Sequence, residues 1–272
     1  MTRQTAPFGR RWLRVTGNEE LGAYRVLRVA DPGGPPPDPG QFAMLTAAER
    51  WGGGQDERPY LPRAFSIARW SDGEAHFLLE DVGPGTHLLC ELRPGDGLWV
   101  LGPLGVGFAA PADGRRAILV GGGAGIAPLA IWQDALMDAG RHRPTALLGF
   151  RDGHRATGAR LLRNAHVATD DGSQGHHGFV TDLLEQELAR ESHATVYACG
   201  PAWMLESVRR MCAEREVPAQ LALESDMACG FGACFGCVVP LRTGGYLRVC
   251  IDGPVLDAAQ LDCVTPSAGA PD

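Results

Sequence analysis

The chain of 272 residues contains no lysine, and all 25 of its basic residues are arginine. Schiff-base catalysis and the Walker-type phosphate loop both require a lysine amine, so this absence excludes both classes. The 32 acidic residues give a formal net charge of −7. Because phosphate backbones bind clustered basic side chains, this charge also argues against nucleic acid as the main partner.

Long hydrophobic runs are absent as well. No stretch approaches the ~18 apolar residues of a membrane-spanning helix, and residues 1–15 hold no apolar core of signal-peptide length. We therefore expect a cytoplasmic protein with no membrane partner. The composition, 44% hydrophobic and 21% charged, is that of an ordinary globular protein, and the length allows about two domains.

Cysteine is sparse except near the C-terminus, where three of the eight cysteines fall within residues 229–237. Thiols stay reduced in the cytoplasm, so such a cluster favours a metal or redox role over structural disulfides. Cys229-x4-Cys234-x2-Cys237, followed after twelve residues by Cys250, has the ligand spacing of plant-type [2Fe–2S] clusters. Zinc sites more often contain paired C-x2-C units, so zinc and a metal-free role remain the alternatives.

The residues around these cysteines favour the cluster. A loop that wraps a cluster must direct N–H groups at sulfur and adopt unusual φ angles, which suits Gly230, Gly232 and Gly236. Three other cysteines have no such neighbours and are interpreted as structural: Cys90, Cys212 and Cys263. His176 and His177 lie in a glycine-rich loop without a suitably spaced carboxylate, so we expect them at the surface rather than on a metal.

The pattern of apolar residues divides the sequence into three parts. Residues 8–112 contain short β-rich runs broken by Gly and Pro, which predicts an antiparallel barrel or sandwich. Residues 113–218 alternate apolar strands with helices, which predicts a Rossmann-like parallel sheet covered on both faces. Residues 219–264 form a small cysteine-rich domain. The expected fold class is therefore β plus α/β, with the cysteine-rich domain at the C-terminal end.

Two glycine-containing strand ends mark an expected dinucleotide site in the second part. The segment LVGGGAGIAPL (119–129) combines a strand, a turn and a helix start, and its glycines would let N–H groups approach a phosphate: Gly121, Gly122, Gly123 and Gly125. The G-x-G-x-x-G pattern is incomplete, because Pro128 occupies the place of the third glycine. Another strand ends in Cys199, Gly200 and Pro201, and open parallel sheets bind ligands at such ends. Cys199 could lie beside a nicotinamide or be a small buried hydrophobe.

Two short motifs in the first part suit a flavin nucleotide. The strand segment RAFS contains Arg63, Phe65 and Ser66. An arginine fork suits a pyrophosphate, an aromatic ring can flank a flat heterocycle, and a hydroxyl can hydrogen-bond a ring nitrogen. By alternation, Arg63 and Phe65 point to one face and Ser66 to the other. The glycine turn VGPGT (82–86) precedes an expected helix and could hold the same phosphate. Alone, RAFS also fits a strand with a surface arginine and a core phenylalanine.

In this order, the barrel, R-x-[FY]-S, G-x-G-T, GGGxGIAP and CGP resemble the ferredoxin reductase family over residues 10–215. The resemblance implies FAD in the first domain and a nicotinamide dinucleotide in the second. It implies FAD contacts at Arg63 (pyrophosphate), Phe65 and Ser66 (flavin), Gly85 and Thr86 (phosphates), and Leu79, Glu80 and Asp81 (beside the flavin). Ala64 stands where the family usually has proline. Losing proline removes no donor or acceptor, so Ala64 stays in the expected site.

The C-terminal part carries a closer resemblance. LESDMACGFGACFGCVV, RVCIDGPVLDAAQL and TDDGSQGHHGFVTDLL resemble the electron-transfer subunits of dihydroorotate dehydrogenase B. This implies cluster ligation by Cys229, Cys234, Cys237 and Cys250. It also implies a partner, an FMN-containing catalytic subunit that oxidises dihydroorotate to orotate in pyrimidine biosynthesis, in a heterotetramer with two of each subunit. Electrons would pass from FMN through the cluster and FAD to NAD⁺, because a flavin exchanges electrons both singly and in pairs.

Other functions remain open from the sequence. An FAD and [2Fe–2S] NAD(P)H reductase subunit of another redox complex, sulfide dehydrogenase-like or hydrogenase-associated, would share the same body. A redox-sensing or metal-binding module without enzymatic activity would not need the flavin and dinucleotide motifs. The choice between NAD and NADP is also open, because Arg151 and Asp152 stand side by side after the second strand and favour different cofactors. The resemblance points to NAD.

Overall fold

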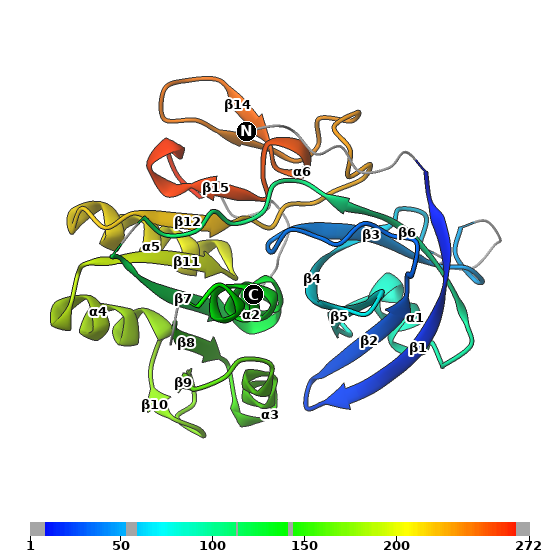
Figure 1. Ribbon diagram of the computed structural model, residues 1–272, viewed down its shortest axis with the longest axis horizontal. Coiled ribbons are helices and arrows are strands. Elements are labelled where there is room, and N and C mark those ends of the chain that lie inside the picture. The colour runs from blue at the N-terminus through cyan, green and yellow to red at the C-terminus, as the bar shows by residue number, and fades with distance from the viewer. Residues whose placement is uncertain (1–8, 53–58, 113, 141–143, 265–272) are drawn as a thin grey trace.

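Short strands separated by Gly- and Pro-rich turns form the first part of the computed structural model, which describes residues 9–52, 59–112, 114–140 and 144–264. Six strands close into an antiparallel barrel in the order β1-β2-β5-β4-β3-β6 (Figure 1). Their bounds are β1 (Arg11–Leu21), β2 (Tyr24–Ala30), β3 (Phe42–Ala47), β4 (Arg63–Ser71), β5 (Glu74–Glu80) and β6 (Gly97–Leu104). The short helix α1 (Pro84–Cys90) follows β5. The predicted antiparallel barrel is confirmed.

Alternating apolar side chains fill this barrel, since successive residues of a strand point to opposite faces. Leu13 and Val15 of β1 pack inside with Leu45 of β3. The outer face of β3 carries Phe42 and Met44, which are buried in a different hydrophobic core. Part of the outer face of the barrel is therefore covered by the rest of the chain.

A seven-stranded sheet forms the second part, in the order β10-β9-β8-β7-β11-β12-β15. Its strands are β7 (Arg116–Gly122), β8 (Thr145–Phe150), β9 (Ala165–Thr169), β10 (His176–His177), β11 (Ala194–Cys199), β12 (Ala219–Ala222) and β15 (Val255–Asp257). Neighbouring strands are parallel throughout, apart from β15, which runs antiparallel to β12. This confirms the predicted Rossmann-like arrangement.

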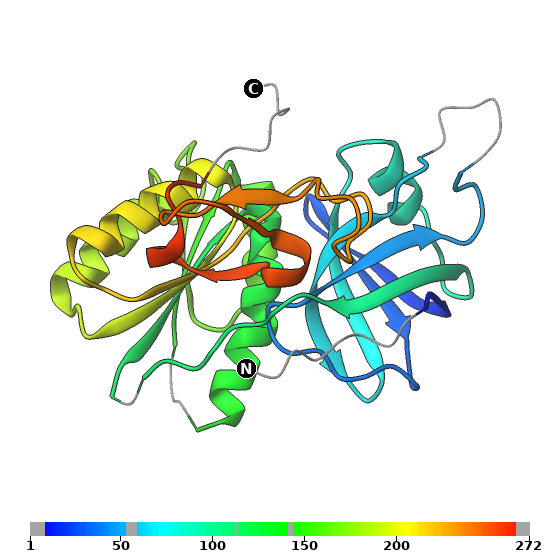
Figure 2. The same ribbon diagram turned by 90° about the horizontal axis from the view of Figure 1, so that it is seen from above.

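Helices cover both faces of the sheet (Figures 1 and 2). The connections contain α2 (Ala127–Asp138), α3 (Gly153–Ala156), α4 (Val180–Arg190), α5 (Ala202–Glu214) and the 3-10 turns η1 (Gly123–Ile126) and η2 (Thr157–Leu161). Helices α4 and α5 lie on the side away from the barrel, and α2 lies between the sheet and β4. An ion pair between Arg69 and Asp134 joins β4 to α2. In the described part of the chain, no helix is long and apolar enough to cross a membrane.

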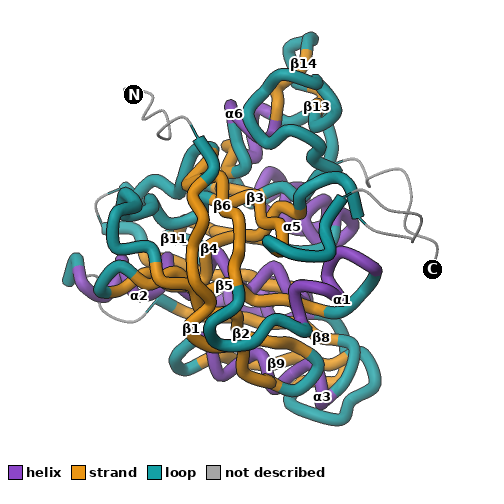
Figure 3. The backbone as a smooth tube through the Cα atoms, turned by 90° about the vertical axis from the view of Figure 1, so that its right-hand side faces the viewer, coloured by secondary structure: helices purple, strands orange, loops and turns teal. Residues whose placement is uncertain are grey.

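The cysteine segment, residues 223–264, lies along the junction of barrel and sheet (Figure 2). It contains β13 (Val238–Pro240), β14 (Tyr246–Arg248), α6 (Val249–Asp252) and η3 (Ala258–Gln260). Figure 3 shows the β13–β14 hairpin at one end of the molecule, beside α6. The expected boundary at residue 218 does not coincide with the end of the sheet, because β12 and β15 both belong to it. The expected boundaries at residues 8 and 113 lie outside the described residues, and the three-domain division stays a prediction.

Candidate functional site

The start of β4 and the start of α1 meet on the barrel. Arg63 Nη1 donates a hydrogen bond to the Leu61 carbonyl at 2.7 Å, and the guanidinium lies 5.9 Å from the centre of the Trp51 ring. A Cβ at Gly85 would lie 2.7 Å from Arg63 Nε, so Arg63 packs directly on the glycine turn. The structure therefore brings together two groups that the sequence predicts separately as contacts to one phosphate.

The RAFS segment has the expected alternation. The antiparallel register places Ser66 opposite Phe42 and Ala64 opposite Met44, and residues paired in this way share a face. Ala64 and Ser66 therefore lie on the outer face of the barrel, while Phe65 is half-buried against the barrel core. Ala64 is exposed, so the outer face beside Met44 is open at this position.

The end of β5, expected beside the flavin, has buried and paired side chains. The side chain of Leu79 is fully buried in the barrel core, so only its backbone could run beside a cofactor. Glu80 Oε1 accepts a hydrogen bond from Arg155 Nε at 3.1 Å, and this ion pair links the barrel to α3. Glu80 is thus part of the contact between the barrel and the α/β part of the chain.

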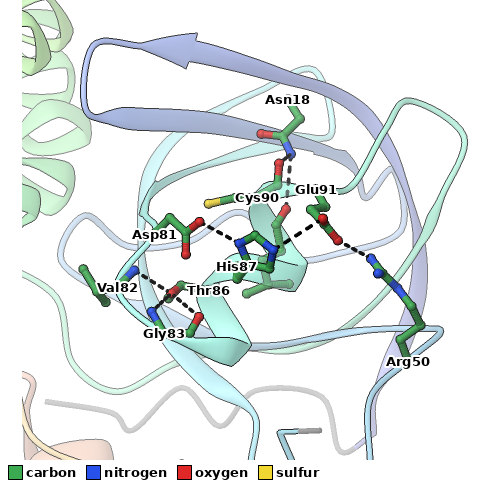
Figure 4. Close-up of polar contacts among 10 residues, drawn as sticks. Asn18, Arg50, Asp81, Val82, Gly83, Thr86, His87, Cys90 and Glu91 are labelled. Carbon is green, nitrogen blue, oxygen red and sulfur yellow. Dashed lines mark hydrogen bonds and ion pairs between the residues drawn. The ribbon is translucent and has the colours of Figure 1, made fainter. Parts of the chain in front are cut away.

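Helix α1 is held by ion pairs along its exposed side (Figure 4). His87 Nδ1 lies 2.8 Å from Asp81 Oδ2, and His87 Nε2 lies 3.4 Å from Glu91 Oε1. The hydrogen bond with Asp81, together with the charges of Asp81 and Glu91, raises the pKa of His87. Thr86 Oγ1 accepts hydrogen bonds from two N–H groups of the preceding turn at 2.9 and 3.0 Å. Since Asp81 and Thr86 engage their own chain, a bound phosphate would meet the backbone of the turn.

The glycine turn after β7 packs on the end of β11. A Cβ at Gly125 would lie 2.6 Å from the Cys199 carbonyl carbon and from Gly200 Cα. A Cβ at Gly122 would lie 2.8 Å from Pro201 Cδ. The two predicted strand ends therefore form one site, in which the close approach of the backbones requires glycine.

A 3-10 turn follows β7, at the place where the sequence predicts a glycine turn before the helix. Gly123, with a φ of 54°, begins η1 in the left-handed region that glycine adopts freely. Helix α2 begins after this turn, and Pro128 lies in its first turn, where proline is tolerated. The incomplete glycine motif thus still gives a strand, a turn and a helix.

Cys199 lies at the end of β11 and is 2% exposed. Burial, with the nearby charge of Glu224, raises the pKa of its thiol well above the ordinary value. The thiol therefore stays protonated, as suits a small buried hydrophobe, and its position beside a nicotinamide stays a prediction. Burial likewise raises the pKa of Cys90 to about 11 and that of Cys212 to about 12, which suits structural cysteines.

A cavity lies between the barrel and the carboxyl edge of the sheet. Its walls include Tyr24 and Glu80 from the barrel and Gly122, Arg151, Asp170 and Trp203 from the sheet side. The rings of Phe179 and Trp203 meet edge to face with centres 5.5 Å apart, and both are about half exposed. Burial and the charge of Asp171 raise the pKa of Asp170, although Arg151 opposes this shift. Five lining residues are not predicted from the sequence: Tyr24, Arg155, Asp170, Phe179 and Trp203.

The four C-terminal cysteines form two pairs of neighbouring sulfurs. Cys229 contacts Cys234, and Cys237 contacts Cys250. The Ala233 N–H donates to Cys229 Sγ at 3.3 Å, and the Cys250 N–H donates to Cys237 Sγ at 3.4 Å. Within the described residues, no three Cys, His, Asp or Glu side chains group around one metal position. All eight cysteines are free of disulfides. A mononuclear zinc site would instead bring four ligands together around one ion.

The two pairs differ in their surroundings. Burial would raise the pKa of Cys229, but the N–H groups of Cys234 and Phe231 outweigh it and lower the pKa to about 7. Burial, together with the hydrogen bond and charge of Cys237, raises the pKa of Cys250 to about 12. The Cys229 thiol therefore ionises more readily than an ordinary thiol, whereas the buried Cys250 thiol resists ionisation.

Left-handed backbone shapes the loop between these cysteines. Gly230 and Gly232 have φ angles of 77° and 83°, and Phe235 has a φ of 58°. A Cβ at Gly232 would overlap the side chain of Ile251. Gly236, which the sequence groups with the other two glycines, does not adopt a left-handed φ.

Known proteins are similar to this chain in sequence. The family model described as "Iron-sulfur cluster binding domain of dihydroorotate dehydrogenase B" matches residues 224–262. The "Dihydroorotate dehydrogenase B (NAD(+)), electron transfer subunit" of Geobacillus thermodenitrificans is 40% identical over 239 residues, covering 82% of this chain and 86% of that protein. The probable subunit of the same name from Methanopyrus kandleri is 37% identical over 252 residues, covering 91% and 90%.

Solved structures share the fold. The structure of an NADH-dependent reduced ferredoxin-NADP oxidoreductase matches with a TM-score of 0.78 and 26% identity, covering 97% of this chain and 92% of that one. A ferredoxin reductase in carbazole 1,9a-dioxygenase matches with a TM-score of 0.66 and 23% identity, covering 77% and 66%. The barrel and sheet thus form a ferredoxin reductase fold, and the cysteine segment corresponds to an iron–sulfur binding domain.

Proposed function

This chain belongs to the electron transfer subunits of dihydroorotate dehydrogenase B (NAD(+)), and we propose that it passes electrons in the order iron–sulfur cluster, FAD, NAD⁺. A flavin exchanges electrons singly and in pairs, so bound FAD would connect the one-electron cluster to the two-electron nicotinamide. The electrons come from an FMN-containing catalytic subunit that oxidises dihydroorotate in pyrimidine biosynthesis. The observation that carries this proposal is the position of the paired cysteines on a ferredoxin reductase barrel, beside the strand that contains RAFS.

The FAD site is proposed on the outer face of β4 and the turn before α1. Arg63 and the N–H groups at Gly85 and Thr86 would hold the pyrophosphate, since arginine forks and free N–H groups both bind phosphate. Phe65 and Ser66 would contact the flavin ring, and the exposed Ala64, on the same face as Ser66, leaves room for it. The backbone of residues 79–81 would run beside the ring.

The cysteine segment fits a two-iron cluster. In a [2Fe–2S] cluster held by four cysteines, each iron takes two thiolates. The pairs Cys229–Cys234 and Cys237–Cys250 match this division. The N–H groups that donate to Cys229 and Cys237 supply the hydrogen bonds that tune such sulfurs. We therefore assign the cluster type as [2Fe–2S], with these four cysteines as its ligands.

The cavity between barrel and sheet would hold NAD⁺. The proposed contacts are Gly121, Gly122, Gly123 and Gly125 for the pyrophosphate, and Cys199, Gly200 and Pro201 for the nicotinamide end. The aromatic rim of Phe179 and Trp203 suits the adenine ring. The carboxylate of Asp170 suits a ribose 2′-hydroxyl and repels a 2′-phosphate. Asp152 instead caps α3, where its Oδ1 accepts a hydrogen bond from the Arg155 N–H at 2.8 Å. This arrangement favours NAD over NADP.

The exposed face of the cysteine segment is the proposed docking surface for the catalytic subunit. Phe231, Phe235 and Tyr246 are 57%, 62% and 72% exposed, and Cys234 is exposed between the two phenylalanines in the loop. Exposed aromatic side chains are enriched in protein interfaces. A partner that delivers single electrons to the cluster has to cover this face. Two copies of each subunit in the assembly and a cytoplasmic location stay predictions.

Purification under anaerobic conditions tests the proposal. We expect bound FAD and about two irons and two acid-labile sulfides per chain. NADH should bleach the flavin and produce the EPR signal of a reduced cluster. Dihydroorotate should reduce NAD⁺ only after the catalytic subunit is added. A preparation without iron and sulfide, or one that transfers electrons to NAD⁺ equally well without the cluster, would contradict the proposal.

A reductase subunit of a different redox complex is the second candidate function. The NADH-dependent reduced ferredoxin-NADP oxidoreductase favours it, because that structure covers 97% of the chain at 26% identity. The dihydroorotate dehydrogenase relatives are closer in sequence, at 37% and 40% identity. Copurification with a dihydroorotate-oxidising subunit would distinguish the two functions.

A further inference from the structure

The cysteine loop rests directly on the outer face of the barrel. Gly230 follows Cys229 and has a φ of 77°. A Cβ at Gly230 would lie 2.5 Å from Met44 Cγ and 2.7 Å from Met44 Sδ. Met44 is 2% exposed. The backbone of the loop and the thioether of Met44 are therefore in contact, with no space for another group between them.

Met44 also borders the strand that contains RAFS. In the antiparallel ladder of β3 and β4, Met44 pairs with Ala64, and on its other side it pairs with Leu101 of β6. Directly opposite residues have Cβ atoms roughly 5 Å apart on the same face. Met44 thus touches the cysteine loop on one side and adjoins the proposed flavin segment on the other.

Further contacts fix the position of the loop on the barrel. The Val106 N–H donates a hydrogen bond to the Gly253 carbonyl at 2.6 Å, which ties the end of β6 to the residues after Cys250. Cys237 and Cys250 are buried in the same hydrophobic core as Met44. Because these contacts hold the segment in place, the side chain at position 44 determines how closely the loop approaches β4.

We propose that Met44 is a positioning residue that sets the spacing between the iron–sulfur cluster and the flavin. The inference rests on the proposed function, because it requires both groups to be bound. NADH delivers two electrons to the flavin as a hydride, the oxidised cluster accepts one of them, and the other stays on the flavin; no bond forms or breaks at Met44. An unbranched, flexible methionine suits this role, since it fills irregular gaps between packed surfaces.

The test follows the two steps separately in the FAD- and cluster-loaded protein, with NADH as the reductant. Stopped-flow absorbance measures flavin bleaching, and EPR of rapidly frozen samples measures cluster reduction. We expect Met44→Ala to leave flavin bleaching unchanged and to speed cluster reduction severalfold, because the loop can settle closer to β4 once the side chain between them is shortened. Met44→Leu conserves the volume and should stay within about twofold of the unsubstituted protein.

A substitution in the loop tests the same contact from the other side. Gly230→Ala places a methyl group against Met44, so it should push the loop outward, change the cluster EPR spectrum and slow cluster reduction. Adding Met44→Ala removes the colliding atoms and should restore part of the rate. Gly244→Ala is the matched control: Gly244 has a φ of 85° and no atom within 4 Å of its Cβ position. This control carries similar backbone strain without the contact and should behave like the unsubstituted protein.

Met44→Ala protein that contains full iron and sulfide could still reduce its cluster at the unsubstituted rate. That result would overturn the inference and leave the proposed function intact. If Met44→Ala protein loses the cluster, the Gly230→Ala protein tests the inference instead. An unchanged EPR spectrum and an unchanged rate of cluster reduction would overturn it. A change in either that is absent from Gly244→Ala would support it. Unsubstituted protein without flavin or cluster would overturn the proposed function together with the inference.

Discussion

The two ends of the proposed electron path are built in different ways. The dinucleotide turn lies at the carboxyl ends of β7 and β11, and every residue of β11 is buried between parallel neighbours. The cysteine loop contains no helix or strand between β12 and β13, and it exposes Cys234 and Phe235. The pairing and packing of the sheet therefore shape the proposed dinucleotide site. The cysteine loop instead depends on a few glycines and on the group that its thiols bind.

Removing one cysteine of the buried pair should separate the behaviour of the two regions most completely. Cys237→Ser should abolish the cluster, since the free energy of metal binding also holds the loop together. NADH should still bleach the flavin, because the barrel and sheet do not depend on the loop. Iron and sulfide analysis with EPR checks the first outcome, and stopped-flow absorbance checks the second. Cys263→Ser is the matched control and should keep the cluster. Loss of flavin bleaching together with the cluster would show that the two ends are not independent.

The barrel end of the path can be weakened separately. Arg63→Gln should weaken FAD binding by about 10- to 100-fold, because hydrogen bonds to charged groups contribute ~1.5–3 kcal/mol. Reconstitution of flavin-free protein, followed by FAD fluorescence, measures this affinity. Arg14→Gln, an exposed arginine on β1, is the control and should leave it unchanged. Equal FAD affinity in the Arg63 and Arg14 variants would argue against a phosphate contact at Arg63.

Rigidity of the dinucleotide site can be tested by a single methyl group. Gly125→Ala would place a Cβ 2.6 Å from the Cys199 backbone, and overpacking of this kind costs ~1–3 kcal/mol. We expect a lower unfolding temperature and a higher KM for NADH, with the cluster EPR signal unchanged. Gly33→Ala has open space around its Cβ position and should change neither quantity. An unchanged unfolding temperature in both variants would mean that the turn moves to accommodate the methyl group and is not rigid.

Features that depend on neighbours in the chain could be predicted from the sequence. The alternation of β4, the glycine turn after β7 and the spacing of the cysteines are local patterns, and the structure contains all three. Features that join distant segments could not be predicted. Nothing in the local pattern shows that β15 returns to β12, or that Gly230 packs on Met44.

Two positions show how contacts between distant segments decide what a side chain can do. The side chain of Leu79 is fully buried, because the face that it occupies is decided only when the barrel closes, so its predicted place beside a flavin concerns its backbone. Asp152, one of the two residues that leave the choice between NAD and NADP open in the sequence, caps α3. A carboxylate that lines the cavity, Asp170, follows β9 within the segment TDDGS, where no local pattern marks it as a neighbour of the barrel.

A carboxylate of α5 connects the cysteine segment to the sheet, and the stability that it contributes depends on pH. Glu206 accepts hydrogen bonds from Arg209 Nη2 at 2.8 Å and from the Val264 N–H at 3.0 Å, so it ties the end of the cysteine segment to the sheet. The hydrogen bond from Arg209, followed by those from Val264 and Arg210, lowers the pKa of Glu206 from 4.5 to about 2. A lowered pKa means that this stabilisation is complete above pH 4.5 and is lost as the pH falls toward 2.

Glu206→Gln should therefore lower the free energy of unfolding by about 2 kcal/mol at neutral pH, a value reduced for solvent screening. The difference should shrink as the pH falls below 4.5. Urea unfolding in the Cys237→Ser background measures it without interference from an acid-labile cluster. Glu214→Gln, on the same helix and exposed, is the control and should have no effect. A difference that stays constant down to pH 2 would exclude ionised Glu206 as its source.

The smallest expected effect concerns the choice of dinucleotide. Asp170→Asn keeps an oxygen that can accept a hydrogen bond from a ribose hydroxyl but removes the charge that repels a 2′-phosphate. Two unit charges 4 Å apart interact by ~1 kcal/mol in water, so KM for NADP⁺ should fall about fivefold while KM for NAD⁺ changes little. Asp138→Asn, exposed at the end of α2, carries the same charge change and should alter neither KM. An equal change for both dinucleotides would place Asp170 away from the ribose. Because the pairing and packing of the sheet hold this edge, the same selectivity change should appear in the Cys237→Ser protein, whose NADH-linked flavin reduction needs no cluster.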